Sequence, residues 1–225
     1  MNLKKIVIFS IAILVVFVSG AVFVYHYSNI FLRNMPTIAK AKLAKEGGVY
    51  VISKDINPFI KEAAIASQDR RFYKNSGVDL QANIRAIYFS AANGQRQGAS
   101  TITEQLIKNV YFEGVDDLNT DILTKVLAVT ATKMYSKDTI LELYLNSIYY
   151  GKQNYGIEKA SEYYFQRPAE SVTLEEAAYL MALINAPSYL SVHKSEADNI
   201  ARIICQSMYQ EKYITQYQLN NDCHL

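Results

Sequence analysis

The feature that most constrains this chain is a run of 20 consecutive residues without a charge, from Ile6 to Tyr25. A helix of that length rises about 30 Å, which matches the hydrocarbon core of a bilayer. A cleaved signal peptide is the alternative, but its apolar region spans only about 7–15 residues. We therefore expect a retained N-terminal membrane anchor over residues 1–29, with a single membrane-spanning helix.

The rest of the chain has the composition of a folded domain. Half of the 225 residues are hydrophobic and a fifth are charged, which excludes a disordered or collagen-like chain. Two cysteines and three histidines argue against a zinc module or a histidine-rich centre, so no metal site is expected. Residues 30–225 carry 21 basic and 21 acidic side chains, so we expect no nucleic-acid partner.

The pattern after the anchor predicts a mainly α fold. Helix starts are indicated by Asn57-Pro58 and by the capping-box patterns Thr101-x-x-Glu104 and Thr173-x-x-Glu176. The only convincing strand signal is GVYVIS at 48–53, and GQRQGAS at 94–100 predicts a polar loop. The predicted helices cover 59–72, 80–93, 101–112, 120–134, 135–146, 156–165, 173–186 and 196–212.

Two features near the ends of this domain leave alternatives open. Residues 28–45 mix apolar and basic side chains, which fits an amphipathic stretch on the bilayer surface or an anchor helix that continues into a polar linker. Cys205 and Cys223 would pair in an oxidising compartment, although two cysteines near a C-terminus are often incidental.

Four polar stretches are unusual for helices that only pack against one another. They cover residues 68–79, 98–109, 144–151 and 182–187. Each alone has an ordinary explanation, such as a helix cap or a buried helix end. The second follows the predicted loop at a helix N-terminus, where backbone N–H groups favour an anion such as phosphate.

Together, in this order and spacing, the four stretches resemble the family 51 glycosyltransferases, the peptidoglycan polymerases of bacteria. The family patterns are Glu-Asp-x-x-Phe-x-x-His-x-Gly-x-Asp and Gly-x-Ser-Thr-Ile-Thr-Gln-Gln-Leu-x-Lys-Asn. The first is matched at Asp69, Phe72, Gly77 and Asp79, and the second everywhere except Glu104. The resemblance covers about residues 57–190, and the single anchor and short length resemble the monofunctional members.

The resemblance implies a lysozyme-like helical glycosyltransferase domain over 57–190, with a membrane-proximal linker at 30–56 and a C-terminal helix and tail at 191–225. It implies a single-pass protein of the cytoplasmic membrane whose domain lies on the periplasmic or extracellular side. The lysines that flank the anchor would place the domain inside, but long domains translocate largely regardless of charge.

The resemblance also implies the ligands and partners. The substrate would be lipid II or a related undecaprenyl-pyrophosphate glycan, and the partners would be the membrane and proteins of cell-wall synthesis. No cofactor is expected, with a divalent cation left open. Lys108 is the best candidate to meet a phosphate charge. The positions that match substrate-binding sites of the family are Ser100, Thr101, Gln105, Lys108, Asn109 and Asn146.

The chain departs from the family where the chemistry is done. One family glutamate takes the acceptor proton, and a second, in an Arg-Lys-x-x-Glu motif, assists near the pyrophosphate. Gln68 and Thr124 stand at these positions, Asn75 replaces the histidine of the first pattern, and the Arg-Lys pair is missing. A neutral amide cannot accept a proton near pH 7, and general-base help is typically worth about 10²–10⁴-fold in rate.

We therefore predict a glycan-binding protein of cell-wall assembly whose polymerase activity is lost or reduced. One alternative is an active glycosyltransferase with a relocated base, for which Asp69 and Glu104 are the candidates. Asp121 lies three residues before Thr124 on the same helix face and is a candidate for the second role. Another alternative is a membrane scaffold that binds no glycan. Whether the chain is an enzyme stays open on the sequence alone.

Overall fold

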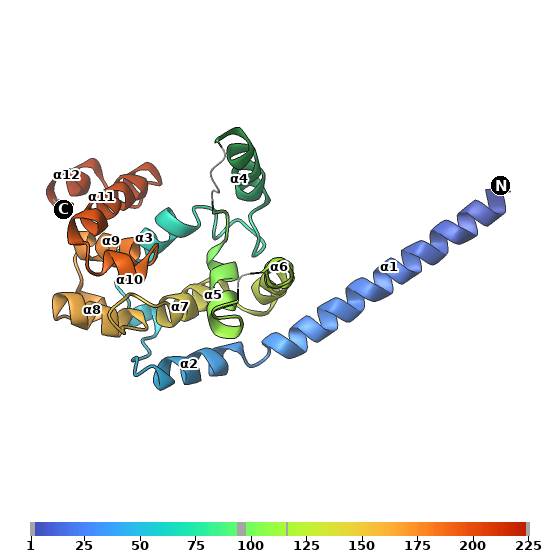
Figure 1. Cartoon of the computed structure of the whole chain (residues 1–225), viewed down its shortest axis with the longest axis horizontal. Helices are drawn as coiled ribbons and strands as arrows, with labels where there is room; N and C mark the ends of the chain where they lie inside the picture. The colour runs from blue at the N-terminus through green and yellow to red at the C-terminus, as the bar shows by residue number, and fades with distance from the viewer. Residues whose placement is uncertain (1–2, 94–97, 116, 224–225) are drawn as a thin grey trace.

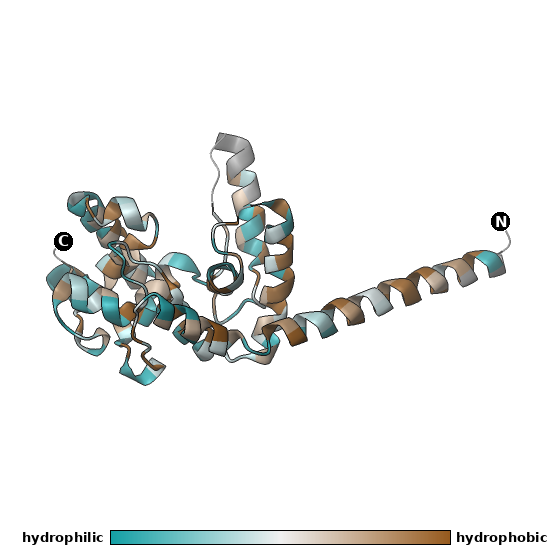
Figure 2. Cartoon of the chain, turned by 60° about the horizontal axis from the view of Figure 1, so that its bottom comes forward, coloured by the Kyte–Doolittle hydropathy of each residue, from teal (hydrophilic) through white to brown (hydrophobic). Residues whose placement is uncertain are grey.

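Helix α1 (Leu3–Leu32) projects from the rest of the chain as a single rod that ends at the N-terminus (Figure 1). An 18-residue window of this N-terminal segment has a mean hydropathy of 2.9, and none of the window is buried. Apolar residues accordingly predominate along α1 (Figure 2). Its length and composition fit the single-pass anchor expected from the uncharged run.

The computed structural model describes residues 3–93, 98–115 and 117–223. The mainly α fold is confirmed, and the described residues contain no strand. Part of the predicted polar loop, residues 94–97, lies outside the described residues. After α1 the elements are α2 (Met35–Lys45), η1 (Ser53–Asp55), α3 (Pro58–Gln68), α4 (Leu80–Asn93), α5 (Ile102–Tyr111), α6 (Leu118–Met134), α7 (Lys137–Ser147), α8 (Ile157–Phe165), η2 (Ala169–Ser171), α9 (Leu174–Leu183), α10 (Pro187–Leu190), α11 (Lys194–Gln210) and α12 (Gln216–Asn221).

The prediction of a strand at 48–53 is wrong, because no strand lies beside this segment in the described part of the chain. The side chain of Asn146, on α7, pairs with the segment's backbone instead. Its side-chain oxygen accepts a hydrogen bond from Val51 N at 3.0 Å, and its side-chain nitrogen donates to Val51 O at 2.9 Å. A single side-chain amide therefore satisfies the backbone of an extended segment that a sheet would otherwise pair.

Helix α2 belongs to the folded domain. Helix α1 continues to Leu32. The chain then turns at Arg33 and Asn34 and enters α2, which packs against α7 and α5. Met35, Ala39 and Leu43 are buried on this packing face. The stretch expected to be a membrane-proximal linker, 30–56, thus supplies part of the core.

Helix α9 is the centre of one packing group. It packs between α3 and α11, and nearly all of its side chains are buried, as expected for a helix that is apolar all round. The predicted capping box at its start is confirmed, since Thr173 and Glu176 exchange hydrogen bonds with each other's backbone. Helices α2, α5, α6 and α7 form a second group.

Helix α3 begins where the sequence predicts and ends earlier. Asn57 caps it by accepting a hydrogen bond from Phe59 N at 2.9 Å, with Pro58 in the first turn. The helix was expected to reach Phe72 but ends at Gln68, because the backbone of Asp69 leaves the helical region at φ −157° and ψ 78°. This early end determines where Gln68 and Asp69 lie.

The open alternative at the C-terminus is settled by a disulfide between Cys205 and Cys223. Cys205 is buried on α11, and Cys223 follows α12, so the bond ties the last helix to α11.

Replacing Cys223 with serine opens an 18-residue loop without removing a core side chain. We expect the free energy of unfolding to fall by about 3 kcal/mol, the stabilisation typical of closing a loop of this size. Urea unfolding of the full chain in detergent, with and without reductant, measures this. An unchanged midpoint in Cys223→Ser would contradict the expectation, and reductant should not destabilise this variant further.

Candidate functional site

A cleft of about 550 Å³ opens where the end of α3, the start of α4, the residues before α5 and the end of α11 meet. Its lining includes four cationic side chains, those of Arg70, Arg71, Lys74 and Arg85. Three carboxylates also line it, but two of them, those of Asp69 and Asp79, are buried and hydrogen-bonded within the protein. The exposed charge of the cleft is therefore mainly positive, which suits an anionic ligand.

Gln68 lines this cleft as the last residue of α3. Its side-chain oxygen accepts a hydrogen bond from Gln105 Nε2 at 3.3 Å, and Gln105 Oε1 accepts one from the Tyr144 hydroxyl at 2.9 Å. Burial raises the pKa of Tyr144, so its hydroxyl stays protonated and acts as a donor. Among the described residues, the Gln68 NH2 group makes only a 3.4 Å contact with Ser67 Oγ. The cleft thus presents a neutral amide at position 68.

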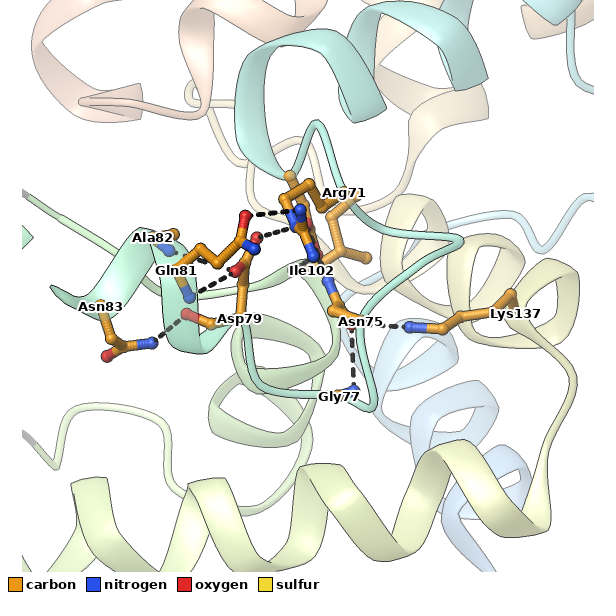
Figure 3. Close-up of polar contacts among 10 residues, drawn as sticks. Arg71, Asn75, Gly77, Asp79, Gln81, Ala82, Asn83, Ile102 and Lys137 are labelled. Atoms are coloured by element: carbon orange, nitrogen blue, oxygen red, sulfur yellow. Dashed lines mark hydrogen bonds and ion pairs between the residues drawn. The ribbon is translucent and has the colours of Figure 1, made fainter. Parts of the chain in front are cut away.

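Asp69 turns away from this position into the protein interior. Its carboxylate is 6% exposed and accepts hydrogen bonds from Asn75 Nδ2 at 2.9 and 3.0 Å and from Ile102 N at 3.3 Å. Burial raises the pKa of the Asp69 carboxyl, although these hydrogen bonds act in the opposite direction. In the same network, Asn75 Oδ1 accepts from Lys137 Nζ at 2.8 Å and from Gly77 N at 3.0 Å (Figure 3).

Asp79 organises the start of α4. Its Oδ1 accepts from Gln81 N at 2.9 Å and from Ala82 N at 3.1 Å, and its Oδ2 lies 3.2 Å from Arg71 Nε (Figure 3). The turn before it requires Gly77, which has φ +96° and lies so close to α6 that a Cβ would be 2.2 Å from Ala128 O. Asp69 and Asp79 therefore both fix the loop between α3 and α4.

Glu104 takes a different role from the predicted capping box. Thr101 does cap α5 by accepting from Glu104 N at 3.1 Å, but the Glu104 carboxylate does not return to the cap, so that half of the prediction is wrong. Instead Glu104 Oε2 lies 2.7 Å from Lys125 Nζ on α6, and Glu104 is 1% exposed. Among the described residues, neither Glu104 Oε1 nor Thr124 Oγ1 has a hydrogen-bond partner.

A second ion pair lies one helical turn further along the same interface. Lys108 Nζ on α5 is 2.5 Å from Asp121 Oδ1 on α6. The best candidate to meet a phosphate is therefore paired with the carboxylate considered for the role of the second glutamate. Since Glu104 pairs with Lys125 in the same way, two ion pairs of opposite polarity join α5 to α6.

The structure brings some predicted site residues together and separates others. Ser100 and Thr101 line the cleft with Gln68 and Asp69, and Gln105 contacts Gln68. Lys108 and Asn109 lie further along α5, outside the cleft lining, and Asn109 O accepts a hydrogen bond from Lys42.

Asn146 lies in the core at 1% exposure, and its side chain is fully used by Val51 and by Glu142 O. Thr124 is likewise buried, at the α5–α6 interface. The sequence reasoning missed Glu211, an exposed carboxylate at the end of α11 that lines the cleft. It lies outside the motifs and outside residues 57–190, so no local pattern signals it.

The comparisons with known proteins agree with these motifs. The chain matches the family described as Transglycosylase over residues 36–209. It is 32% identical over 200 residues to a monofunctional glycosyltransferase of Staphylococcus haemolyticus, which covers 84% of this chain and 74% of that protein. It is 35% identical over 178 residues to penicillin-binding protein 1A of Rickettsia bellii and, over the same length, to penicillin-binding protein 1F of Bacillus subtilis.

The two matches include 76% and 78% of this chain. They span only 22% and 25% of the length of the two penicillin-binding proteins. The matched range begins in α2 and ends in α11, so it contains every residue that lines the cleft except Glu211. The chain therefore belongs to the transglycosylase family, family 51 of the glycosyltransferases.

The Glu104–Lys125 pair should be strongly coupled. Lys125→Met leaves a buried carboxylate without its cation. We expect it to lower the free energy of unfolding by about 2–3 kcal/mol, less than the ~3–5 kcal/mol of fully buried pairs, because Lys125 is partly exposed. In the double variant Glu104→Gln/Lys125→Met the loss should be smaller than the sum of the single losses. Urea unfolding in a double-mutant cycle measures the coupling, and additive losses would contradict it.

Asp69 should make stability depend on pH. Because its pKa is raised, the Asp69 carboxyl binds a proton more tightly in the folded protein than in the unfolded chain, where the pKa of an aspartate is about 3.9. Its contribution to stability is thus greatest below that pH and is lost as the pH rises through the folded pKa. The free energy of unfolding of the wild type, relative to Asp69→Asn, should fall from pH 3 to pH 7. A constant or rising difference would contradict the assignment.

Proposed function

We propose that this protein binds lipid II, or a related undecaprenyl-pyrophosphate glycan, in the cleft beside Gln68, and that its polymerase activity is lost or strongly reduced. The observation that carries the proposal is the engaged amide of Gln68 at the position of the family's base. A member of this family with a basic cleft but no proton acceptor at that position retains binding groups without the group that deprotonates the acceptor sugar.

The two candidate substitutes for the base are committed elsewhere. Asp69 is hydrogen-bonded to Asn75 and to Ile102 N, and its helix end turns it away from Gln68. Glu104 is buried and paired with Lys125. A general base has to reach the proton that it abstracts, within about 2.6–3.2 Å or through one water molecule. Both carboxylates therefore fit structural roles better than catalysis.

An apolar surface between α1 and α6 supports a membrane-borne ligand. Helix α6 presents Asp121 and Lys125 toward α5, and it presents Leu123, Val126 and Leu127 toward α1. The latter line an apolar cavity of about 300 Å³ between α1 and α6, at the end of the anchor nearest the domain. Helix α6 thus presents an apolar face beside the anchor, which suits the lipid chain of a membrane-borne ligand.

The disulfide supports a place outside the cytoplasm. Disulfides persist in oxidising compartments and are rare in the cytosol. The Cys205–Cys223 bond therefore favours the orientation in which the domain lies on the periplasmic or extracellular side and the anchor is retained in the cytoplasmic membrane.

A second candidate function, an active glycosyltransferase with a relocated base, is favoured by Glu211. Its carboxylate is exposed, lines the same cleft as Gln68, and has no hydrogen bond or ion pair with any residue that the structure describes. This makes Glu211 a better candidate for a relocated base than Asp69 or Glu104.

A lipid II turnover assay on the full chain in detergent separates these functions. We expect the wild type to bind lipid II and to form no polymer above background. Gln68→Glu should raise polymer formation by about 10²-fold or more, the usual effect of a general base. Gln68→Leu is the matched control, since it changes the same position without adding a carboxylate.

The outcomes distinguish the candidates. Polymer formed by the wild type and abolished by Glu211→Gln would replace the main proposal with the relocated base. Absence of lipid II binding in both the wild type and Gln68→Glu would favour a scaffold that binds no glycan.

A further inference from the structure

A second cavity, of about 390 Å³, is lined by residues of α8, α9 and the start of α11 and by Ser191. These helices lie on the opposite side of the domain from α1 (Figure 1). None of its lining residues lines the cleft beside Gln68. Its lining consists of Tyr163, Tyr164, Phe165, Glu175, Glu176, Tyr179, Ser191 and Lys194. It therefore combines four aromatic rings with two carboxylates and one ammonium group.

The rings form one connected cluster. Tyr164 meets Tyr179 edge to face at 6.0 Å between ring centres, and Phe165 meets Tyr179 at 5.7 Å. Tyr163 packs edge to face on Tyr164 at 4.9 Å and is 53% exposed. Burial raises the pKa of Tyr164 and of Tyr179, so both remain neutral phenols at physiological pH. Neutral aromatic faces carry the negative quadrupole that attracts a cation.

The ammonium group of Lys194 already makes a cation–π contact with this cluster. Lys194 Nζ lies 5.5 Å from the centre of the Tyr179 ring, and it also binds both carboxylate oxygens of Asp198, at 2.9 and 3.0 Å. The Lys194 side chain is nevertheless 77% exposed, so it can swing into solvent at little cost. The Tyr179 ring and Asp198 would then be available to an ammonium group from outside.

The carboxylates differ in what they contact. Glu176 closes the capping box with Thr173 and lies 3.6 Å from Arg167. Glu175, half-buried in the first turn of α9, has no hydrogen bond or ion pair with any residue in the described part of the chain. The helix dipole favours a carboxylate there, but it does not supply a counter-ion. The cavity thus keeps one acid unpaired beside an aromatic surface.

We propose that this cavity is a binding site for a cationic side chain, a lysine-type ammonium or an arginine guanidinium, presented by a peptide segment of a partner. The aromatic cluster supplies the cation–π surface and Glu175 supplies the counter-charge. Lys194 occupies the edge of the site in the free protein and competes with the incoming cation. The site lies apart from the cleft, so this proposal does not depend on lipid II binding.

The test is a titration of the full chain in detergent, with ring-¹³C-labelled tyrosine, followed by NMR. The probe is the peptide acetyl-Gly-Lys-Gly-amide, and its control is the same peptide with the lysine side chain acetylated. The lysine peptide should shift the resonances of Tyr163, Tyr164 and Tyr179 with a millimolar dissociation constant. The acetylated peptide should not, and raising the salt concentration should weaken binding by screening the charges.

Three variants sharpen the result. Glu175→Gln, which keeps the shape of the side chain, should weaken binding by about twofold to fivefold, the loss of one partly exposed charge contact. Lys194→Ala should tighten binding by about threefold or more, because it removes the competing ammonium. Lys54→Ala is the matched control, since Lys54 is equally exposed (76%) and lies elsewhere, on η1, and it should change nothing.

Two outcomes would overturn the proposal. One is equal binding of the charged and acetylated peptides, or no shift of these tyrosines by either. The other is a shift of the same resonances by an N-acetylglucosamine trimer with no response to Lys194→Ala, which would identify a saccharide site instead.

Discussion

The cleft depends on one buried carboxylate, that of Asp69. By accepting hydrogen bonds from Asn75 and from Ile102 N, it ties the end of α3 to the following turn and to the start of α5. Asn75 extends the connection to Lys137 on α7. Because an unpaired buried carboxylate would cost several kcal/mol, this set of partners fixes the backbone that ends α3. Gln68, the preceding residue, is placed at the cleft as a consequence.

If Gln68 stands in place of the family's glutamate, as we propose, that placement explains how the fold tolerates the loss of one negative charge. Gln105 donates to an oxygen that an amide and a carboxylate both possess, so the Tyr144–Gln105 chain accommodates either residue. At the α5–α6 interface the buried acid Glu104 on α5 is paired with Lys125 on α6, and the neighbouring Thr124 is a buried neutral hydroxyl. The electrostatics there are balanced within the protein and do not need a ligand.

Much of the fold could be predicted from local signals. The Asn57-Pro58 start of α3, the Thr173 cap of α9 and the uncharged run of α1 each rest on interactions within one segment, and each is present. The failures depend on contacts between distant segments. Asn146 pairs with Val51 across 95 residues, Glu104 turns to Lys125 across 21, and Glu211 reaches the cleft from the end of α11. No pattern within a segment reports such contacts.

The central claim is that no carboxylate stands where the acceptor sugar must lose its proton. A crystal structure of the full chain with a non-reactive lipid II analogue in the acceptor position tests it most directly, through the distance from the sugar 4-hydroxyl to the nearest side-chain atoms. We predict that the Gln68 amide lies within hydrogen-bonding distance, about 2.6–3.2 Å, and that no carboxylate does. A carboxylate of Glu211, Asp69 or Glu104 at that distance would contradict the account.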